Sequence, residues 1–233
     1  MYVRADNALQ KVKVVVFDLD GTLLNTLEDL AAATNWALRH NGMAERTVDE
    51  VRRFVGNGVR RLMEQAVPAG TDSSLFEKTF ADFKSYYVHH CQERTCLYDG
   101  ISDMLRALRQ EGFRLAIVSN KLQAGVNELY EQYFRDTVAL AIGERPGLAR
   151  KPAPDMVQLA LRELGARAEE AVYVGDSDVD LQTALNSGLP CISVLWGFRD
   201  KAFLLEHGAT RLASTPAEVI NLLGPLSSPN SHL

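Results

Sequence analysis

The chain contains five short runs of apolar residues, and within each run the hydrophobicity is continuous instead of alternating. A strand with one face in water alternates apolar and polar residues, whereas a strand buried on both faces is apolar throughout. The continuous pattern therefore predicts a sheet that is covered on both faces. The predicted strands are residues 12–17, 113–118, 137–142, 171–174 and 191–195.

Helical patterns separate these runs. Residues 101–108 carry apolar side chains at the i, i+3, i+4 and i+7 positions, the spacing of a helix with one apolar face. Residues 157–164 show a similar spacing, and Gly165 then provides a stop signal. Because strands that alternate with helices form βαβ units, the sequence predicts an α/β fold with a mainly parallel sheet.

One long stretch, from about residue 27 to about residue 93, contains no predicted strand. Glycine and proline residues divide it into four helical segments, 28–40, 48–54, 59–67 and 73–92. A helical block directly after the first strand predicts an inserted cap domain at the carboxyl end of that strand, where open α/β sheets bind their ligands. The predicted division is a core of residues 1–24 and 96–233 and an all-helical cap of residues 25–95.

Polar residues follow the ends of three predicted strands, where a buried strand alone would not require them. They are Asp18 and Asp20 after the first strand, Ser119 and Asn120 after the second, and Asp176 with Asp180 after the fourth. Lys151 lies in the connection that precedes the fourth strand. Since the carboxyl ends of parallel strands lie on one edge of a sheet, we expect these side chains to converge on one crevice.

The residue types at this edge suit phosphoryl transfer. Neighbouring carboxylates repel one another unless a cation compensates them, and Mg²⁺ accepts a few protein oxygens beside water and phosphate. Lys151 suits a phosphoryl oxygen, and Ser119 with the N–H groups around Asn120 offers further donors. Asp18 is then a credible nucleophile, and Asp20 is placed to protonate the leaving oxygen and later to deprotonate the attacking water.

Each of these residues also has a purely structural interpretation. Asp18 with Asp20, and Ser119, are typical of turns and helix N-caps. Asp176 and Asp180 could form a capping pair at a helix start that binds no metal. The catalytic interpretation is preferred because it accounts for all of these strand ends together.

Four segments resemble, in order and spacing, the motifs of the haloacid dehalogenase superfamily. They are FDLDGT (17–22), VSN (118–120), the lysine of ARKPAPD (149–155) and VGDSDVD (174–180). The first and fourth motifs are specific to the superfamily. The second and third are a single serine and a single lysine, which are informative only because they occur in the expected order. The resemblance implies a Rossmann-like parallel sheet with strand order 5-4-1-2-3, in which the five predicted strands are numbered along the chain.

The resemblance also implies roles for single residues. Asp18 is expected to be the nucleophile and a magnesium ligand, and Asp20 the acid/base whose carbonyl also binds the metal. Asp176 is expected to be the third protein ligand, and Asp180 a residue that positions Lys151 or a metal-bound water. Phosphate binding is assigned to Gly21, Thr22, Ser119, Asn120 and Lys151. Asn25 departs from many relatives, which have Asp or Glu there, but it lies outside this set.

Within the superfamily, the helical insert resembles the cap of the phosphoglycolate phosphatase group. The resemblance lies in FVGNGVRRLMEQAV (54–67), FKSYY (83–87) and, in the core, WGF (196–198). It implies a small phosphate monoester as the substrate, with phosphoglycolate as the first candidate. Gly56, Asn57 and Gly58 would let a cap turn approach the catalytic edge, and Arg52 or Arg53 would meet a substrate carboxylate.

The composition limits the kinds of binding partner and the cellular compartment that we expect for this protein. A formal net charge of −5 gives no electrostatic footprint for nucleic acid, and no apolar run approaches the length of a membrane span. Three cysteines without a pairing pattern favour free thiols, and the N-terminus lacks the apolar stretch of a signal peptide, so we expect a cytoplasmic protein. We also expect a monomer or weak homodimer, with a disordered tail over residues 224–233.

Three other functions compete with a phosphatase. A phosphomutase of the β-phosphoglucomutase type shares the motifs and the helical cap, but passes the phosphoryl group to a sugar. Phosphatases of the same superfamily that act on nucleotides, sugar phosphates or pyrophosphate are further alternatives. A dehalogenase needs no metal and generally lacks the second aspartate, so Asp20 argues against it. A binding module without activity predicts the loss of a motif residue, and none is missing.

Overall fold

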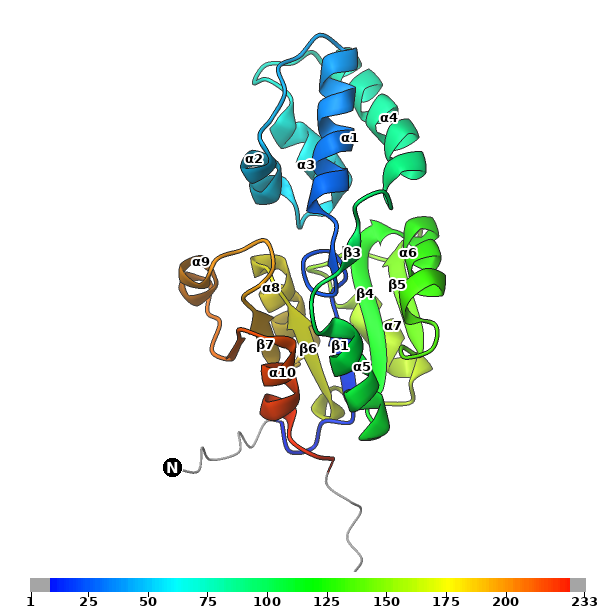
Figure 1. Ribbon diagram of the computed structural model, residues 1–233, viewed down its shortest axis with the longest axis vertical. Coiled ribbons are helices and arrows are strands. Elements are labelled where there is room, and N and C mark those ends of the chain that lie inside the picture. Colours follow the sequence, from blue (N-terminus) through cyan, green and yellow to red (C-terminus); the bar gives the residue numbers. More distant parts are fainter. Residues whose placement is uncertain (1–8, 227–233) are drawn as a thin grey trace, which may run out of the picture. The chain divides into compact units, whose positions relative to one another are not determined.

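The computed structural model describes residues 9–226, and the chain divides into two compact units (Figure 1). One unit is Met1–Leu23 with Tyr98–Leu233, and the other is Leu24–Leu97. These limits lie close to the predicted domain limits, while the role of the second unit as a cap stays a prediction. Among the described residues, no helix is long and apolar enough to cross a membrane.

The first unit is built on a parallel sheet of six strands in the order β5-β4-β1-β6-β7-β8. The strands are β1 (Val14–Phe17), β4 (Arg114–Leu122), β5 (Leu140–Glu144), β6 (Ala171–Gly175), β7 (Cys191–Val194) and β8 (Leu212–Ala213). In the numbering of the predicted strands this order is 3-2-1-4-5, followed by β8. The central strand β1 is fully buried, with Val14 opposite Arg114 on β4 and Ala171 on β6.

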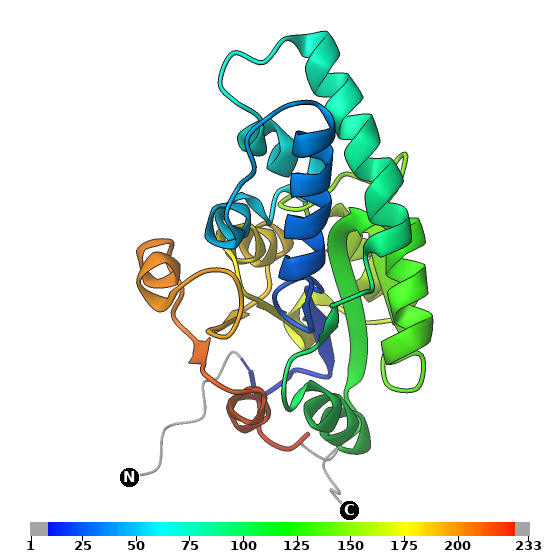
Figure 2. The same ribbon diagram turned by 45° about the horizontal axis from the view of Figure 1, so that its top comes forward.

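Helices cover both faces of this sheet, which explains the continuous apolar runs. On one face, α7 (Asp155–Glu163) and α8 (Asp178–Ser187) pack against apolar side chains of β1, β4 and β6. On the other, α5 (Ile101–Gln110) and α10 (Pro216–Leu223) lie side by side (Figures 1 and 2). The remaining elements of this unit are α6 (Gln123–Leu129), a π-helical turn (Tyr130–Phe134), a 3₁₀ turn (Ala168–Glu170) and α9 (Lys201–Glu206).

The second unit is helical, with a short strand pair at its two ends. Its helices are α1 (Leu27–His40), α2 (Val48–Phe54), α3 (Gly58–Ala66) and α4 (Ser73–His90). Strands β2 (Leu24–Asn25) and β3 (Cys96–Leu97) pair in antiparallel fashion. Two-residue strands carry no detectable periodicity, and for that reason neither this pair nor β8 was predicted.

Several predicted strand limits were wrong: β4 runs on to Leu122 and β5 to Glu144, beyond the predicted ends at 118 and 142, and two strands begin later than predicted. The segment predicted as 137–142 begins as a strand only at Leu140, because the N–H groups of Thr137 and Val138 both donate to the carbonyl of Phe134 and close the preceding helical turn. At the start of the chain, Val12 N donates to Leu9 O in a turn, so that β1 begins at Val14. Of the predicted disordered tail, residues 227–233 lie outside the described part, while Gly224 N donates to Ile220 O at the end of α10.

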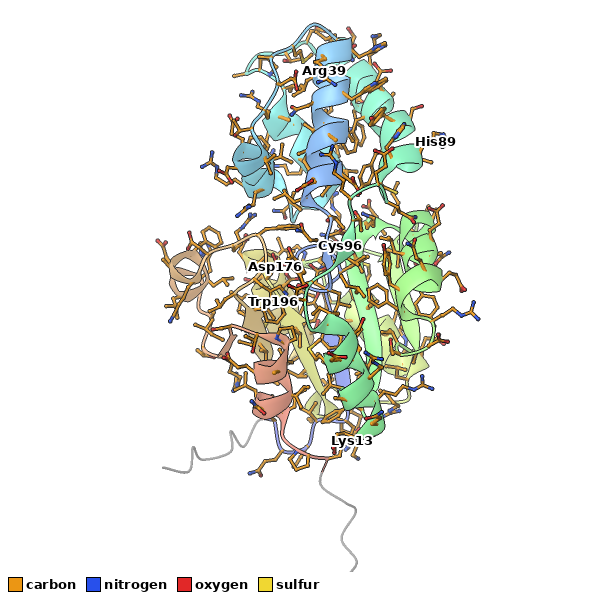
Figure 3. The ribbon with its side chains drawn as sticks, viewed as in Figure 1. Lys13, Arg39, His89, Cys96, Asp176 and Trp196 are labelled. Carbon is orange, nitrogen blue, oxygen red and sulfur yellow. The ribbon has the colours of Figure 1, made fainter. Side chains whose placement is uncertain are left out.

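An ion pair ties the start of β1 to the turn before β6. Lys13 Nζ lies 2.9 Å from Glu170 Oε1, at the end of the sheet remote from Asp176 (Figure 3). The hydrogen bonds from Lys13 and from the backbone of Arg167 lower the pKa of Glu170 from its ordinary 4.5 to about 2. The pair therefore contributes stability above pH 4.5, and the contribution is lost as the pH falls toward 2.

Glu170→Gln should consequently lower Tm at pH 7, and the difference from the wild type should close progressively between pH 4.5 and pH 2. Thermal melts across this range measure the difference. Glu169→Gln, an exposed neighbour, is the matched control and should show no such pH-dependent difference. A constant Tm difference for Glu170→Gln across the range would contradict the pairing.

Candidate active site

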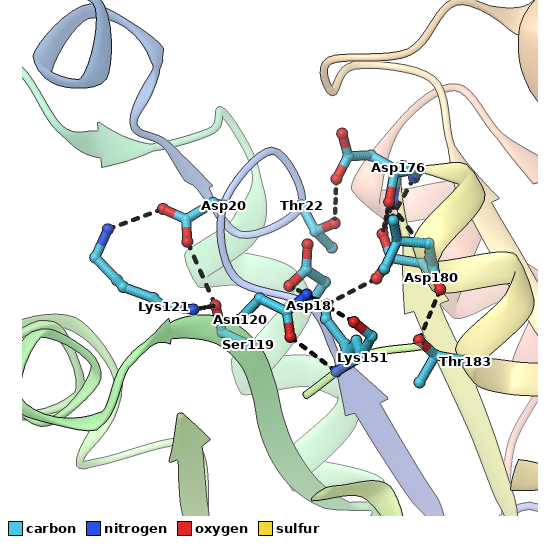
Figure 4. Close-up of polar contacts among 12 residues, drawn as sticks. Asp18, Asp20, Thr22, Ser119, Asn120, Lys121, Lys151, Asp176, Asp180 and Thr183 are labelled. Carbon is cyan, nitrogen blue, oxygen red and sulfur yellow. Dashed lines mark hydrogen bonds and ion pairs between the residues drawn. The ribbon is translucent and has the colours of Figure 1, made fainter. Parts of the chain in front are cut away.

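The loop after β1 turns back sharply and presents two aspartates. Asp18 N still donates to Val174 O of β6, and the carbonyl of Leu19 then accepts from the N–H of Thr22 and of Leu23 to form a turn. Gly21 adopts φ 94°, and a Cβ there would lie 2.5 Å from Asp176 Oδ2, so glycine is required for both reasons. The Asp18 carboxylate faces Lys151 and the Asp20 carboxylate faces β4 (Figure 4).

Lys151 lies at the centre of the site and is 3% exposed. Its Nζ is 2.6 Å from Asp18 Oδ1, 2.9 Å from Asp180 Oδ1 and 3.0 Å from the hydroxyl of Tyr173. Burial alone would lower the pKa of this ammonium, but Asp18 and Asp180 outweigh burial and raise the pKa well above its ordinary value. Lys151 is therefore a permanent positive charge beside Asp18.

The Asp180 carboxylate is saturated by hydrogen bonds. Its Oδ1 accepts from Lys151 and Tyr173, and its Oδ2 accepts from the N–H of Asp176 and from the N–H and the hydroxyl of Ser177. Ser177 and Asp180 form a capping box at the start of α8, so the structural interpretation of Asp180 holds as well. A carboxylate has about four lone-pair sites, which leaves Asp180 little capacity for a metal.

Asp176 follows β6 and is held by the segments on either side of it. Thr22 Oγ1 donates to Asp176 Oδ1 at 3.0 Å, and Phe198 N donates to Oδ2 at 2.7 Å. Trp196 Nε1 donates to the carbonyl of Thr22 at 2.9 Å and so joins the two holding segments; Figure 3 shows Trp196 and Asp176 near one another. Each Asp176 oxygen accepts one bond, so both keep a lone pair for a cation.

The end of β4 supplies three consecutive buried polar residues, Ser119, Asn120 and Lys121. Ser119 Oγ lies 3.4 Å from Asp20 Oδ2, and Lys121 Nζ lies 3.1 Å from Asp20 Oδ1. The side chain of Asn120 turns the other way and bonds both backbone groups of Lys151, at 2.8 and 3.0 Å. The Asn120 carboxamide therefore supports Lys151, and only its backbone N–H stays proposed for phosphate.

The charges of the site do not cancel. Four carboxylates (Asp18, Asp20, Asp176 and Asp180) face two ammonium groups, Lys121 and Lys151, so the site would carry two negative charges with every group ionised. Burial and the nearby Asp180 raise the pKa of Asp18 well above its ordinary value despite Lys151. Burial and Asp180 also raise the pKa of Asp176 to about 7. A bound divalent cation would remove this repulsion.

The donor set fits a hard cation. One carboxylate oxygen from each of Asp18, Asp176 and Asp180 lies within 4.8 Å of the others. Because Asp180 is saturated, the carboxylates with free capacity are Asp18 and Asp176, which come from two adjacent strands. Oxygen donors without histidine or thiolate suit magnesium or calcium rather than zinc. The site can therefore hold a divalent cation between β1 and β6.

The predicted site residues divide into two groups. The structure brings Asp18, Asp20, Gly21, Thr22, Ser119, Asn120, Lys151, Asp176 and Asp180 together at the carboxyl edge of the sheet. Arg53, Gly56, Asn57 and Gly58 belong to the helical unit, where Arg53 is exposed in the last turn of α2. The roles of these four residues stay predictions.

Two residues of the site were missed at the sequence level. Tyr173 lies inside an apolar run, where nothing distinguishes it from a core residue. Lys121 directly follows the VSN segment, and its two-residue spacing from Ser119 would have placed both side chains on one side of a strand. That spacing signals a polar strand end at Lys121, but it does not encode the contact with Asp20.

Comparison with known proteins agrees with this arrangement. Residues 15–194 match the model of the haloacid dehalogenase-like hydrolase family. A phosphoglycolate phosphatase of Rhodobacter capsulatus is 36% identical over 200 residues, covering 84% of this chain and 90% of that protein. One from Pseudomonas putida is 32% identical, covering 92% of this chain and 78% of that protein.

Solved structures show the same fold. A crystal structure from Lactobacillus delbrueckii subsp. bulgaricus superposes with a TM-score of 0.88 at 36% identity, covering 91% of this chain and 98% of that one. The CbbY protein of Rhodobacter sphaeroides, solved in complex with phosphate, superposes with a TM-score of 0.69 at 26% identity, covering 89% of this chain and 96% of that one. The chain belongs to the haloacid dehalogenase-like hydrolase family.

Proposed function

We propose that this protein is a magnesium-dependent phosphatase that hydrolyses a small phosphate monoester through an aspartyl-phosphate on Asp18. The observation that carries the proposal is the contact between Asp18 and the buried ammonium of Lys151, 2.6 Å apart, beside carboxylates that could hold a metal ion. A nucleophilic carboxylate next to a permanent positive charge is what attack on a phosphate ester requires.

Asp18 and Asp176, with the backbone carbonyl of Asp20, would hold the magnesium ion. When bound, the ion supplies positive charge that favours the ionised carboxylates and neutralises phosphate oxygens. Thr22 and the N–H of Phe198 orient Asp176 for this task, and Asp180 keeps Lys151 aimed at Asp18. This support is the kind that holds a metal site in a productive geometry.

In the first half-reaction, an oxygen of Asp18 forms a bond to phosphorus while the bond from phosphorus to the ester oxygen breaks. Lys151 and the hydroxyl of Ser119 bind phosphate oxygens and balance their charge. Asp20 donates its proton to the leaving oxygen, so an alcohol departs. The products of this step are the free alcohol and the phosphorylated Asp18.

In the second half-reaction, water attacks the same phosphorus. Asp20, now a carboxylate, takes the proton of that water, and the bond from phosphorus to the Asp18 oxygen breaks. Inorganic phosphate leaves, Asp18 is a carboxylate again, and Asp20 holds the proton needed for the next cycle. The two roles of Asp20 require its carboxylate to be held at a defined place.

For the substrate, we propose phosphoglycolate as the first candidate. The proposal rests on the relatives in Rhodobacter capsulatus and Pseudomonas putida, both phosphoglycolate phosphatases. Arg53, with Gly56, Asn57 and Gly58, stays our proposal for the residues that recognise the substrate beyond its phosphate. We further propose a cytoplasmic location, which the three free thiols of the described residues support, and a monomer or weak homodimer.

The test is phosphate release from a panel of phosphate monoesters, with phosphoglycolate included, in Mg²⁺ and again in EDTA. The proposal predicts magnesium-dependent release, with the highest kcat/KM for phosphoglycolate. Equal release from many esters would support the phosphatase activity but would contradict phosphoglycolate as the preferred substrate. A sugar phosphate that isomerises without releasing phosphate would replace the phosphatase with a mutase, and chloride release from a haloacid in EDTA would refute both.

Gly197 provides a test of the metal assignment. A Cβ at this position would lie 2.5 Å from Asp176 Oδ2, so Gly197→Ala must displace the Asp176 carboxylate. We expect the Mg²⁺ concentration for half-maximal activity to rise by about 10-fold or more, because displaced metal ligands typically cost that much. A magnesium titration measures it, and an unchanged midpoint would contradict the role of Asp176.

A further inference from the structure

Lys121 is a buried charge that the proposed chemistry does not use. It is 8% exposed, and its side chain forms an ion pair with Asp20, whose own side chain is only 16% exposed. A buried ion pair is a weak source of stability, because the desolvation of both groups offsets their attraction. A lysine at this place in the sheet edge therefore calls for a role other than stabilising the fold.

The backbone around Lys121 is shaped to bring it to Asp20. Val118 pairs with Ile142 and Leu122 pairs with Glu144, so the register between β4 and β5 shifts across residues 119–121. A Cβ on Gly143 would lie 2.7 Å from Lys121 O, which shows how closely β5 approaches this segment. The bulge lets β4 continue to Leu122, and bulges of this kind often re-aim side chains next to active sites.

Lys121 holds one oxygen of the Asp20 carboxylate, and Ser119, whose hydroxyl would turn to a phosphate oxygen when substrate binds, lies 3.4 Å from the other. Lys121 Nζ binds Oδ1 and Ser119 Oγ lies near Oδ2, while the N–H of Lys121 donates to Ser119 Oγ at 3.1 Å (Figure 4). The stem of Lys121 runs past Gly125 of α6, where a Cβ would lie 3.5 Å from its Cε. The lysine is thus held at both its backbone and its side chain.

We propose that Lys121 is a positioning residue for Asp20, which it holds in the orientation that delivers a proton to the leaving oxygen. Each reacting aspartate then has its own lysine, Lys151 for the nucleophile and Lys121 for the acid/base. This inference rests on the proposed phosphatase function. It assigns Lys121 no contact with the substrate phosphate.

Comparing two substrates with different leaving groups distinguishes a loss of Asp20 positioning from a general structural defect. An alkyl phosphate such as phosphoglycolate needs a proton on its leaving oxygen, whereas p-nitrophenolate departs without one. Lys121→Met should therefore lower kcat for the alkyl ester by about 10–100-fold, the usual cost of losing such support, with KM little changed. With p-nitrophenyl phosphate, the pre-steady-state burst of p-nitrophenol should keep its rate.

Asp20→Asn serves as the benchmark and Lys13→Met as the matched control. Asp20→Asn should also lower kcat for the alkyl ester while keeping the burst rate with p-nitrophenyl phosphate. The double variant Asp20→Asn/Lys121→Met should have a kcat no lower than that of Asp20→Asn, because both substitutions remove the same proton transfer. Lys13 forms its ion pair at the opposite end of the sheet, so Lys13→Met should match the wild type in kcat and in burst rate. If Lys121→Met does not fold, Lys121→Gln keeps a donor near Asp20 and should show a smaller loss of the same pattern.

Each outcome decides the inference. A slower burst or a raised KM with both esters would mean that Lys121 binds phosphate, and the positioning role would be wrong. Activity equal to that of Lys13→Met would also overturn it, while leaving the phosphatase intact. If the wild type itself hydrolyses neither ester, the proposed function fails and the inference falls with it.

Discussion

Asp18→Asn is expected to lower kcat by about 10⁴-fold or more, which is the scale of effect seen when a nucleophile is removed. Asparagine keeps the size of the side chain and can still accept a hydrogen bond from Lys151, but an amide oxygen is a poor nucleophile toward a phosphate ester. Phosphate release under saturating substrate and Mg²⁺ measures the effect. Substantial remaining activity would show that another group attacks phosphorus.

The loss must be separated from unfolding. Asp18→Asn removes a buried carboxylate whose pKa is raised by burial and by Asp180, so its Tm should be equal to or above that of the wild type. Asp103→Asn, which changes an exposed carboxylate of α5 paired with Arg106, is the control and should leave kcat unchanged. A large drop in Tm for Asp18→Asn would make its inactivity uninformative about the chemistry.

Lys151→Met is expected to abolish turnover and also to lower the free energy of unfolding by about 3–5 kcal/mol, because it strands buried carboxylates without their counter-charge. Two of these carboxylates, Asp18 and Asp180, lie within 2.9 Å of Nζ. Denaturant unfolding measures the destabilisation. Lys78→Met, at an exposed ion pair with Asp82, is the control and should change stability by about 0.5 kcal/mol or less.

A second substitution tests the electrostatic cause. Adding Asp180→Asn to Lys151→Met removes one stranded charge, and the hydroxyl of Tyr173 can turn to accept from the new amide. The double variant should regain part of the lost stability while staying inactive. If Lys151→Met were as stable as the wild type, the carboxylates beside it would not carry the charge assigned to them.

Much of the site could be predicted because the rule that places it is simple. The carboxyl ends of parallel strands share one edge, so residues 99 positions apart in sequence, such as Asp20 and Ser119, are expected to lie close together, and they do. Continuous apolar runs located the main strands for the same reason, since burial on both faces leaves no alternation. Asp180 was expected to position Lys151 or a metal-bound water, and its Oδ1 lies 2.9 Å from Lys151 Nζ.

Other features depend on local geometry that no periodicity encodes. Lys121 reaches Asp20 only because β4 bulges against the glycine at position 143, and the pattern of apolar residues ends before that point. Tyr173 is buried like a core residue, and only the folded structure shows its hydroxyl between Lys151 and Asp180. The late start of β5 likewise follows from a helical turn that closes on Phe134 O, a choice between two local hydrogen-bond patterns.

A covalent phosphoryl group on Asp18 can be detected by its chemical capture. The wild type would be mixed with substrate and Mg²⁺, quenched in acid within the first turnover and treated with borohydride, which reduces an acyl phosphate to an alcohol. We expect homoserine at position 18, found by mass spectrometry only when both substrate and Mg²⁺ are present and absent from Asp18→Asn. Turnover without modification of Asp18, or modification of another carboxylate, would contradict it.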